Sequence, residues 1–348
     1  MGLIRLLLAF AVLVDHSTPL WGCRFLGGEL SVQCFFAISG FYMAMILEGP
    51  YMRQIPAFFK NRFLRIFPMY WVVLAISALS SSALWIATSG SHPGTLFAWR
   101  AHGLDLGAGP SLLLAISIPL LLFQDTTLFL GVDPATRALL PVLDFRNTPI
   151  PMVAFLPVPP SWSLSLELYF YLLAPWVARW RLRWIAVLTG LSLGLRFAMG
   201  LRGLDFDPWS YRFFPTSICF FLFGVMAWKL GRRFNVDRAP RALATTVWLG
   251  MLATMLGWKE VGEIGTLILV ASLAGSLPVI FSLTRVWKWD RWFGDLSFPL
   301  YLIHWEVFAI TPRLPTPLRF LAALLAAAAL QHFVGSRVDR WRSHPRAG

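Results

Sequence analysis

Apolar segments of bilayer length recur along the whole chain, and no other feature constrains its fold as strongly. A helix needs about 20 apolar residues to cross the hydrocarbon core of a membrane. Such segments lie at 3–20, 31–48, 66–88, 162–178, 184–200, 212–230, 242–258, 263–284, 294–311 and 318–336. Hydrophobic residues make up 57% of the 348 residues and charged residues 14%, a balance that excludes an ordinary soluble globule. The pattern predicts an all-α polytopic membrane protein of about ten transmembrane helices, forming one domain over residues 1–348.

The distribution of basic residues predicts the orientation of these helices. With a cytoplasmic N-terminus, the inside segments hold 20 of the 30 Lys and Arg residues, as the positive-inside rule requires. We therefore expect an integral protein of a bacterial inner membrane with both termini in the cytoplasm. The segment 3–20 has a weakly basic start and no small-residue cleavage site, so we expect a retained helix rather than a signal peptide. The net charge of +13 then reflects topology and attraction to the lipid bilayer, and no nucleic-acid partner is expected.

The stretch 89–160 is rich in Gly and Pro and contains the apolar run 111–130. Counting this run as a further span would invert every basic loop after it. We therefore expect a long outer-side segment after the third helix, in which the run dips into the membrane or lies on its outer surface. The cysteines Cys23, Cys34 and Cys219 are odd in number and lack metal-ligand spacing, which predicts neither a disulfide framework nor a metal site.

The first apolar segment carries ionisable side chains at two depths. Arg5 and His16 are eleven residues apart, which on a helix is a rotation of about 1100° and a rise of roughly 16 Å, so both lie on one face. Asp15 lies about 100° round the helix from His16. Ionisable residues inside a membrane are costly and usually functional. The alternative is that Arg5 extends to the interface and His16 is a packing residue.

Two arginines just before the third segment form a candidate anion site. Arg62 and Arg65 are three residues apart and therefore neighbours on one helical face. Two adjacent guanidinium groups at a cytoplasmic surface suit a phosphorylated ligand bound in bidentate fashion. The alternative is that both residues only anchor the helix to lipid head groups.

Polar positions also occur inside the second and fourth segments. Gly40 allows close backbone approach, which we expect against the first helix, and Ser39 can hydrogen-bond a neighbouring helix. Glu167 falls about one and a half turns inside its segment, where a buried carboxylate needs a partner such as an arginine or histidine of another helix. A structural ion pair and a group that orients a catalytic residue are both open for Glu167.

The ninth segment carries three polar side chains at helical spacing. Tyr301 and His304 are three residues apart, and Ser297 lies a further turn back on the same face. Together these side chains can line a polar cavity. The alternative for His304 is a packing role at the membrane interface.

Five motifs, in this order along the chain, resemble those of the acyltransferase 3 family of integral membrane O-acyltransferases. They are Arg5-x10-His16, Phe-Phe-x-x-Ser-Gly-Phe at 35–41, Arg62-x-x-Arg65 followed by Pro68 and Tyr70, Trp-Ser-Leu-x-x-Glu at 162–167, and Ser-x-x-x-Tyr-Leu-x-His at 297–304. The resemblance implies about ten spanning helices, an acyl-CoA donor taken from the cytoplasm, and acylation of a hydroxyl on a carbohydrate, lipid-linked glycan or secondary metabolite. Asp15 before His16 and Cys34 before Phe35 are atypical of that pattern.

The resemblance also implies roles for these residues. Arg62 and Arg65, with Arg5, would bind the acyl-CoA co-substrate, acetyl-CoA above all, and no metal would be needed. The pantetheine arm would then run beside the first helix and bring the thioester near His16. His16 would deprotonate the acceptor hydroxyl or carry the acyl group itself. Asp15, Ser39, Ser297 and His304 are further candidates for the pocket.

The second ring nitrogen of His16 needs a partner, either Glu167 or Asp15. Because Asp15 lies about 100° round the helix, its carboxylate cannot readily orient that ring, and we favour Glu167. Tyr301 or His304 would donate a hydrogen bond to the developing oxyanion. The acceptor would enter from the outer side, beneath the long segment.

A transporter or lipid flippase is the alternative, because it too would bury arginine, histidine and glutamate along a path. The ordered match of five motifs and the lack of an internal repeat favour the enzyme. We therefore expect an acyl-CoA-dependent membrane O-acyltransferase, of the kind that O-acetylates polysaccharides. Its expected partners are acyl-CoA, a carbohydrate or glycolipid acceptor and the lipid bilayer.

Overall fold

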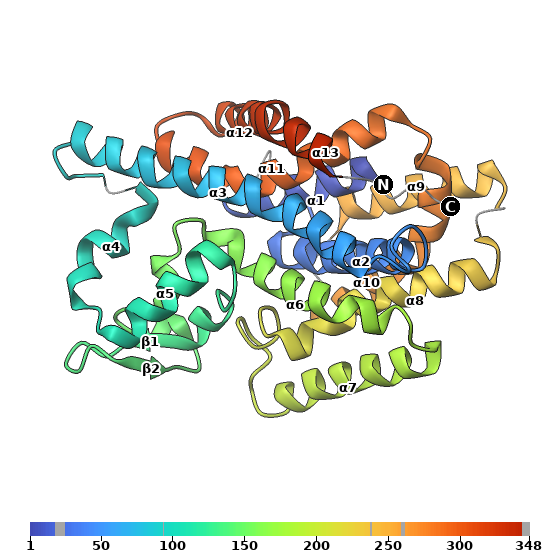
Figure 1. The fold of residues 1–348 in the computed structure, drawn as a ribbon, viewed down its shortest axis with the longest axis horizontal. Helices are drawn as coiled ribbons and strands as arrows, with labels where there is room; N and C mark the ends of the chain where they lie inside the picture. Colours follow the sequence, from blue (N-terminus) through green and yellow to red (C-terminus); the bar gives the residue numbers. More distant parts are fainter. Residues whose placement is uncertain (18–24, 93, 237–238, 259–261, 343–348) are drawn as a thin grey trace.

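The computed structural model describes residues 1–17, 25–92, 94–236, 239–258 and 262–342, and in them a helix occupies each of the ten predicted positions (Figure 1). These helices are α1 (Gly2–Asp15), α2 (Gly28–Leu47), α3 (Ile55–Ala87), α6 (Trp162–Val177), α7 (Leu182–Gly200), α8 (Phe214–Arg233), α9 (Arg241–Gly257), α10 (Gly262–Thr284), α11 (Lys288–Ile310) and α12 (Thr316–Leu330). A π-helical stretch, Gln331–Gly335, joins α12 to α13 (Ser336–Trp341).

Six helices within the described residues are long and apolar enough to cross a membrane. They are α2, α3, α7, α8, α10 and the continuous run Thr316–Trp341. The chain is therefore a helical polytopic membrane protein, and the count of ten spans stays a prediction. Residues 18–20 of the predicted first span lie outside the described residues.

Helix α3 begins earlier than the apolar segment suggested. It starts at Ile55, with a proline in its first turn, and runs for 33 residues, whereas the predicted span begins at residue 66. Proline suits this position because its missing N–H would have no helical partner there. The extension places Arg62 and Arg65 within the helix, so their positions on one face are fixed by helical geometry.

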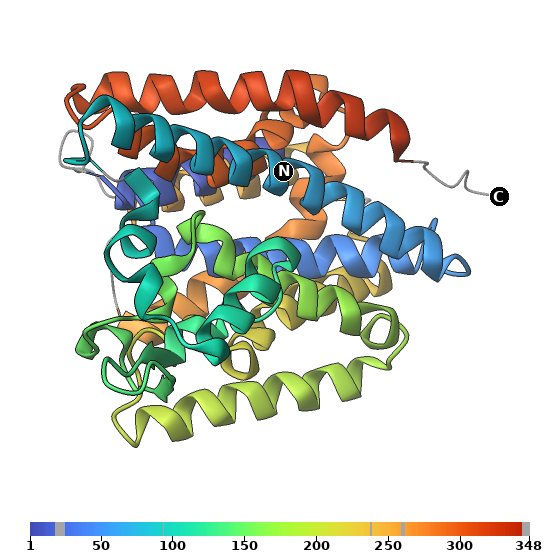
Figure 2. The same cartoon turned by 60° about the vertical axis from the view of Figure 1, so that its left-hand side comes forward.

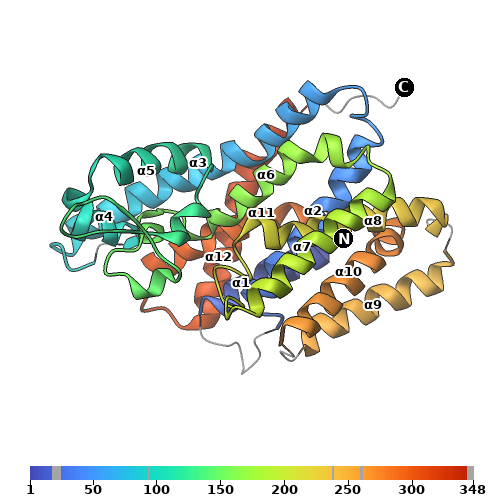
Figure 3. The same ribbon diagram turned by 90° about the horizontal axis from the view of Figure 1, so that it is seen from below.

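The long segment after α3 is only partly helical. It contains two short helices, α4 (Phe97–His102) and α5 (Ala108–Leu120), and an antiparallel pair of strands, β1 (Leu130–Val132) and β2 (Leu139–Pro141), so the chain is not wholly α-helical. The run 111–130 is not one helix, because α5 ends at Leu120 and Leu121 has a positive φ of 58°. Seen from below, this segment lies at one edge of the molecule and α9 at the other (Figure 3).

The connecting loops separate to two ends of the bundle (Figure 2). At one end, the long segment is tied to the α7–α8 loop by an ion pair between Arg146 and Asp207 at 2.7 Å. At the other end, Lys229 donates to the carbonyl oxygen of Ala178 at 2.8 Å and pairs with Glu48 at 2.5 Å. The predicted inside loops thus gather at one end and the long segment lies at the opposite one.

Helices α1 and α11 pack with their backbones in close contact. The Asp290 carboxylate accepts hydrogen bonds from the backbone N–H groups of Gly2, at 2.7 Å, and Leu3, at 2.9 Å, and so caps the first turn of α1. A Cβ atom on Gly2 would lie 1.5 Å from the Asp290 carbonyl oxygen, so only glycine fits. This contact fixes how far α1 is shifted along α11.

Helices α2 and α8 make a second close crossing, again through glycine. A Cβ on Gly40 would lie 1.8 Å from the Phe221 carbonyl oxygen, and one on Gly224 would lie 1.8 Å from the Ala37 carbonyl oxygen. The close approach predicted at Gly40 is therefore confirmed. The expected partner was wrong, because Gly40 meets α8 and not α1.

Candidate functional site

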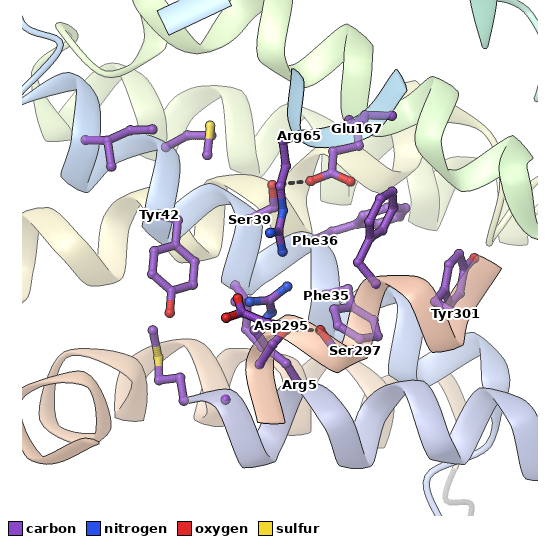
Figure 4. A pocket seen from close by; sticks show the side chains of 18 of the residues that line it. Arg5, Phe35, Phe36, Ser39, Tyr42, Arg65, Glu167, Asp295, Ser297 and Tyr301 are labelled. Carbon is purple, nitrogen blue, oxygen red and sulfur yellow. Dashed lines mark hydrogen bonds between the residues drawn. The ribbon is translucent and has the colours of Figure 1, made fainter. Parts of the chain in front are cut away.

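A cavity of about 610 Å³ lies among the helices, and most of the predicted site residues line it (Figure 4). Those that do are Arg5, Ser39, Arg62, Arg65, Glu167, Ser297 and Tyr301. They come from α1, α2, α3, α6 and α11, so the cavity brings together residues that are far apart in the sequence. Asp15, His16 and His304 are not among its lining residues.

Positive charge dominates the wall of this cavity. Six arginines line it: Arg5, Arg62, Arg65, Arg285, Arg291 and Arg342. Three carboxylates do so as well: Glu167, Asp290 and Asp295. Among the described residues, only Arg342 of the six arginines pairs with a carboxylate, that of Asp339, at 2.6 Å. Guanidinium groups left without acidic partners in a concave site indicate a ligand with several negative charges.

Three of these six arginines were not recognised from the sequence. Arg285, Arg291 and Arg342 lie near the ends of apolar segments, where basic residues usually report only topology. No motif or spacing marks them as a set. Their convergence depends on the end of α10, the start of α11 and the end of α13 meeting around the same cavity.

Arg5 and Arg65 face each other across the cavity from α1 and α3 (Figure 4). The Arg65 guanidinium also lies 5.8 Å from the centre of the Phe298 ring, a distance at which a cation attracts an aromatic face. Ser297, the neighbour of Phe298 on α11, also lines the cavity. Its hydroxyl donates to the Gly294 carbonyl oxygen at 2.7 Å. Donor groups from opposite walls can hold an anionic ligand from both sides.

Glu167 is held by hydroxyl groups rather than by a cation or a histidine. Its Oε1 accepts a hydrogen bond from the Ser39 hydroxyl at 2.9 Å and another from the Tyr171 hydroxyl. The expected hydrogen bond from Glu167 to His16 is not formed. The carboxylate lines the cavity instead.

His16 is hydrogen-bonded to His304, a pairing that was not predicted. The Nδ1 atom of His16 lies 3.0 Å from Nε2 of His304. The two rings are inclined by only 11° while their centres are 5.2 Å apart, so they meet through their nitrogen edges. His304 is fully buried, whereas His16, the residue that follows α1, is exposed on its other side.

The hydrogen bonds of His304 define which nitrogens carry protons. Its Nδ1 lies 2.8 Å from the carbonyl oxygen of Tyr301. A carbonyl can only accept, so Nδ1 of His304 carries the proton and its Nε2 is the acceptor in the neutral ring. His16 must then donate from Nδ1, which leaves the lone pair of neutral His16 on Nε2, the nitrogen that a general base needs. Both nitrogens of His304 are thereby engaged in hydrogen bonds, and the expected role of His304 as an oxyanion donor stays a prediction.

The register of two parallel helices brings these histidines together. Gly2 contacts Asp290, and fourteen residues later His16 contacts His304, with the same sequence separation of 288 in both pairs. The two contacts are 14 residues apart on α1 and also 14 residues apart on α11, in the same order. The two helices therefore run in the same direction, and residues that are 288 positions apart lie at the same level along their axes. The glycine contact at their start therefore sets the height at which the two rings meet.

Asp15 contacts the beginning of α2 and not the His16 ring. A Cβ atom on Gly28, the first residue of α2, would lie 2.7 Å from Oδ2 of Asp15, so the carboxylate sits directly against the helix start. A negative charge is favourable there, because the N-terminus of a helix carries partial positive charge. This position agrees with the prediction that Asp15 cannot orient His16.

Tyr301 lies between the cavity and the histidine pair. It lines the cavity, and its ring centre is 6.2 Å from that of His304 and 6.2 Å from that of Phe35. Its hydroxyl is 2.8 Å from the Ser163 hydroxyl and donates to the Pro160 carbonyl oxygen at 3.1 Å. These bonds hold the Tyr301 hydroxyl in place.

Two buried carboxylates outside the cavity fasten the long segment to the bundle, and the sequence did not mark them. Asp125 accepts from the Tyr169 hydroxyl of α6 at 2.7 Å, and burial raises the pKa of Asp125 to about 6. Glu306 of α11 accepts from the Thr95 hydroxyl at 3.3 Å and from Ser80. The segment is thus anchored close to the helix that carries His304.

Comparison with known proteins identifies the family of this chain. Residues 1–330 match the acyltransferase 3 family, described as an acyltransferase domain. An uncharacterized protein of Aquifex aeolicus (strain VF5) is 24% identical over 161 residues, which are 44% of this chain and 71% of that protein. No solved structure matches. Because the match extends over all five motifs and nearly the whole chain, this protein belongs to the acyltransferase 3 family.

Proposed function

We propose that this protein transfers an acyl group, acetyl above all, from cytoplasmic acyl-CoA to a hydroxyl of a carbohydrate, lipid-linked glycan or secondary metabolite. The observation that carries the proposal is the arginine-lined cavity of about 610 Å³ in a chain of an acyltransferase family. A cavity of this size is typical of small-molecule sites. The phosphate groups of CoA are the anions that such guanidinium groups bind in bidentate fashion.

The histidine pair supports a site where donor and acceptor arrive from opposite sides. The cavity extends towards Tyr301 and His304 from the end where the chain's basic loops gather. His16 is exposed on its other side. An acceptor in the outer leaflet or beyond would meet His16 there, while the thioester would approach past the Tyr301 ring. In this proposal the protein lies in a bacterial inner membrane with both termini in the cytoplasm.

The proposed reaction uses His16 as the general base. Nε2 of His16 takes the proton of the acceptor hydroxyl, and the oxygen attacks the thioester carbonyl carbon. The C–S bond then breaks, and the imidazolium returns the proton to the CoA thiolate. The products are an ester and free CoA, so atoms and charges balance.

His304 acts as a positioning residue in this scheme. Its Nε2 accepts the Nδ1–H of His16 before and after His16 is protonated, because Nδ1 carries a proton in both states. The ring orientation is therefore unchanged through the proton transfer. A neutral partner also avoids the need to bury a carboxylate beside the reacting groups.

Acetyl-CoA labelled in the acetyl group tests this proposal on the purified protein in detergent. We expect the wild type to release free CoA by transfer or slow hydrolysis, and a transporter to leave the thioester intact. His16→Ala should abolish the reaction at unchanged protein abundance. His16→Gln should not restore it, because an amide cannot take the proton. A His16→Ala variant with a tenth or more of the wild-type rate would exclude His16 as the base.

A further inference from the structure

The arginine cavity is open at one end and closed at the other. On α11 its lining residues run from Asp290 to Tyr301, a rise of roughly 16 Å. At the first end, Arg285 and Arg291 line the cavity and are exposed, so the cavity opens to the surface where α10 ends and α11 begins. The second end is the one beside the histidine pair. The lining residues there that are at most 7% exposed are Val32, Ser163, Leu164 and Tyr301.

Two aromatic rings meet at this closed end, that of Phe35 on α2 and that of Tyr301 on α11. Their centres are 6.2 Å apart and their planes are inclined by 63°, the edge-to-face arrangement that aromatic pairs favour. Both rings lie on the side of the cavity away from Tyr42 (Figure 4). The ring of His304, centred 6.2 Å from that of Tyr301, does not line the cavity. The two aromatic rings therefore lie between the cavity and the histidines.

Beyond these rings, little protein separates the cavity from the surface. His304 is buried behind Tyr301 and is hydrogen-bonded to His16, which is exposed. A continuous path from the arginine end of the cavity to His16 would be wet and lined by cations, and such a path through a membrane conducts anions. An apolar constriction stops this conduction because it excludes water. Phe35 and Tyr301 lie where such a constriction is needed.

The two rings differ in how firmly they are held. The Tyr301 hydroxyl is 2.8 Å from the Ser163 hydroxyl and donates to the Pro160 carbonyl oxygen at 3.1 Å. The Phe35 ring has no polar atom, is only half-buried and borders the cavity. A phenylalanine in a helix has two favoured χ1 positions, so this ring can leave Tyr301 without any movement of α2. Phe35 is thus the movable member of the pair.

We propose that Phe35 is a gate between the arginine cavity and His16. Closed against Tyr301, its ring keeps ions and water from crossing the protein. Moved aside by a bound donor, it lets the thioester pass to His16. The passage of the thioester rests on the proposed function, whereas the seal does not.

Chloride release from vesicles tests the seal. The purified protein is reconstituted into phospholipid vesicles loaded with potassium chloride, and valinomycin carries potassium to balance the charge. Wild-type vesicles should be as tight as protein-free ones. Phe35→Ala should release chloride at least about tenfold faster, because the apolar constriction is lost. Tight Phe35→Ala vesicles, or wild-type vesicles that leak equally fast, would overturn the gate.

Two further variants show whether the position and the ring matter. Phe281→Ala is the matched control and should stay tight. Its ring also lines the cavity but contacts Tyr42, which is about two helical turns from Phe35 on α2. Phe35→Tyr keeps the ring and should stay tight as well. Equal leakage through Phe35→Tyr and Phe35→Ala would contradict the gate, because the ring would then not be what closes the path.

Acetyl-CoA without an acceptor tests the passage of the thioester. In the wild type the ring holds the thioester back, so hydrolysis should be slow. In Phe35→Ala the thioester reaches His16, which can activate water from its exposed side, and free CoA should be released faster. Hydrolysis by Phe35→Ala that is no faster than that of an active wild type would overturn the passage.

The two measurements separate this inference from the proposed function. A chloride leak in Phe35→Ala, with no acetyl transfer or hydrolysis by the wild type, would keep the seal and reject the proposed reaction. Acetyl transfer by the wild type, with tight Phe35→Ala vesicles, would keep the reaction and reject the gate.

Discussion

At the scale of single residues, the proposed function assigns the chemical step and donor binding to different side chains. The hydrogen-bonded pair His16 and His304 would carry the chemical step, and the arginines of the cavity would bind the donor. Neither histidine lines the arginine cavity, so their replacement should change the rate of the chemical step and not the affinity for the donor. In the proposed function the arginines of the cavity wall bind the donor, so their replacement should change the affinity for the donor and not the rate of the chemical step. Turnover and KM should therefore respond to different sets of residues.

His304→Leu tests this division. Leucine keeps the volume but removes the acceptor for the Nδ1–H of His16, so the ring loses its orientation and tautomer. We expect kcat to fall by about 10²- to 10⁴-fold, as when the orienting group of a catalytic histidine is lost, with the KM for acetyl-CoA unchanged. His332→Leu, at an exposed position outside the cavity, is the control. A raised KM with normal kcat would place His304 in donor binding.

The sequence indicated most residues of the site but not how they pair. Arg5, Arg62 and Arg65 were found by spacing, and all three line the cavity, while their role in donor binding stays a prediction. The partner of His16 was assigned to Glu167, because helix geometry could exclude Asp15 but could not position one helix against another. His304 lies 288 residues away, and its contact depends on the register of two helices.

At the scale of helices, glycine contacts determine which helices touch. A bilayer gives apolar side chains little reason to prefer one helix over another, so close packing and hydrogen bonds select the partners. Gly2 sets α1 against α11, and Gly40 with Gly224 sets α2 against α8. The positions of the helices followed from hydropathy alone. Hydropathy did not predict which helices pair, because the pairing depends on which backbone lies opposite each glycine.

Gly40→Ala should destabilise the bundle. Its Cβ would lie 1.8 Å from a backbone oxygen of α8, so the two helices would have to separate. We expect a loss of about 1–3 kcal/mol, the usual cost of overpacking, seen as a lower melting temperature in detergent. Gly275→Ala in α10 is the matched control, because nothing lies within 4 Å of its added Cβ. Equal melting temperatures for the two variants would show that the α2–α8 crossing can relax.

At the scale of the whole molecule, charge and loops are divided between two ends. The loops that hold the basic residues lie towards one end, and the long segment with its strand pair lies at the other (Figure 2). The charge pattern predicted this division. It did not predict the internal structure of the long segment, because short turns and strands there depend on contacts with α3, α6 and α11 rather than on periodicity.

Thiol labelling in intact cells tests which end faces the cytoplasm. Ser91→Cys reports on the long segment and Gln54→Cys on the start of α3, both at exposed positions, in a background with Cys23, Cys34 and Cys219 replaced. An impermeant reagent should label the first and not the second, whereas permeabilised cells should show both. The reverse pattern would put the arginine cavity on the side without CoA and reject the proposed donor.

The pairing of α1 with α11 also has a consequence for how the protein is made. The ribosome completes α1 first, yet the helix that supplies Asp290 and His304 follows 288 residues later. At synthesis rates of about 5–20 residues per second, this delay is roughly 15 to 60 s. During that time the nascent chain holds Arg5 and His16 in the membrane without their eventual neighbour. Insertion order therefore leaves α1 without its partner helix for most of synthesis, and the two histidines can meet only when α11 has been made.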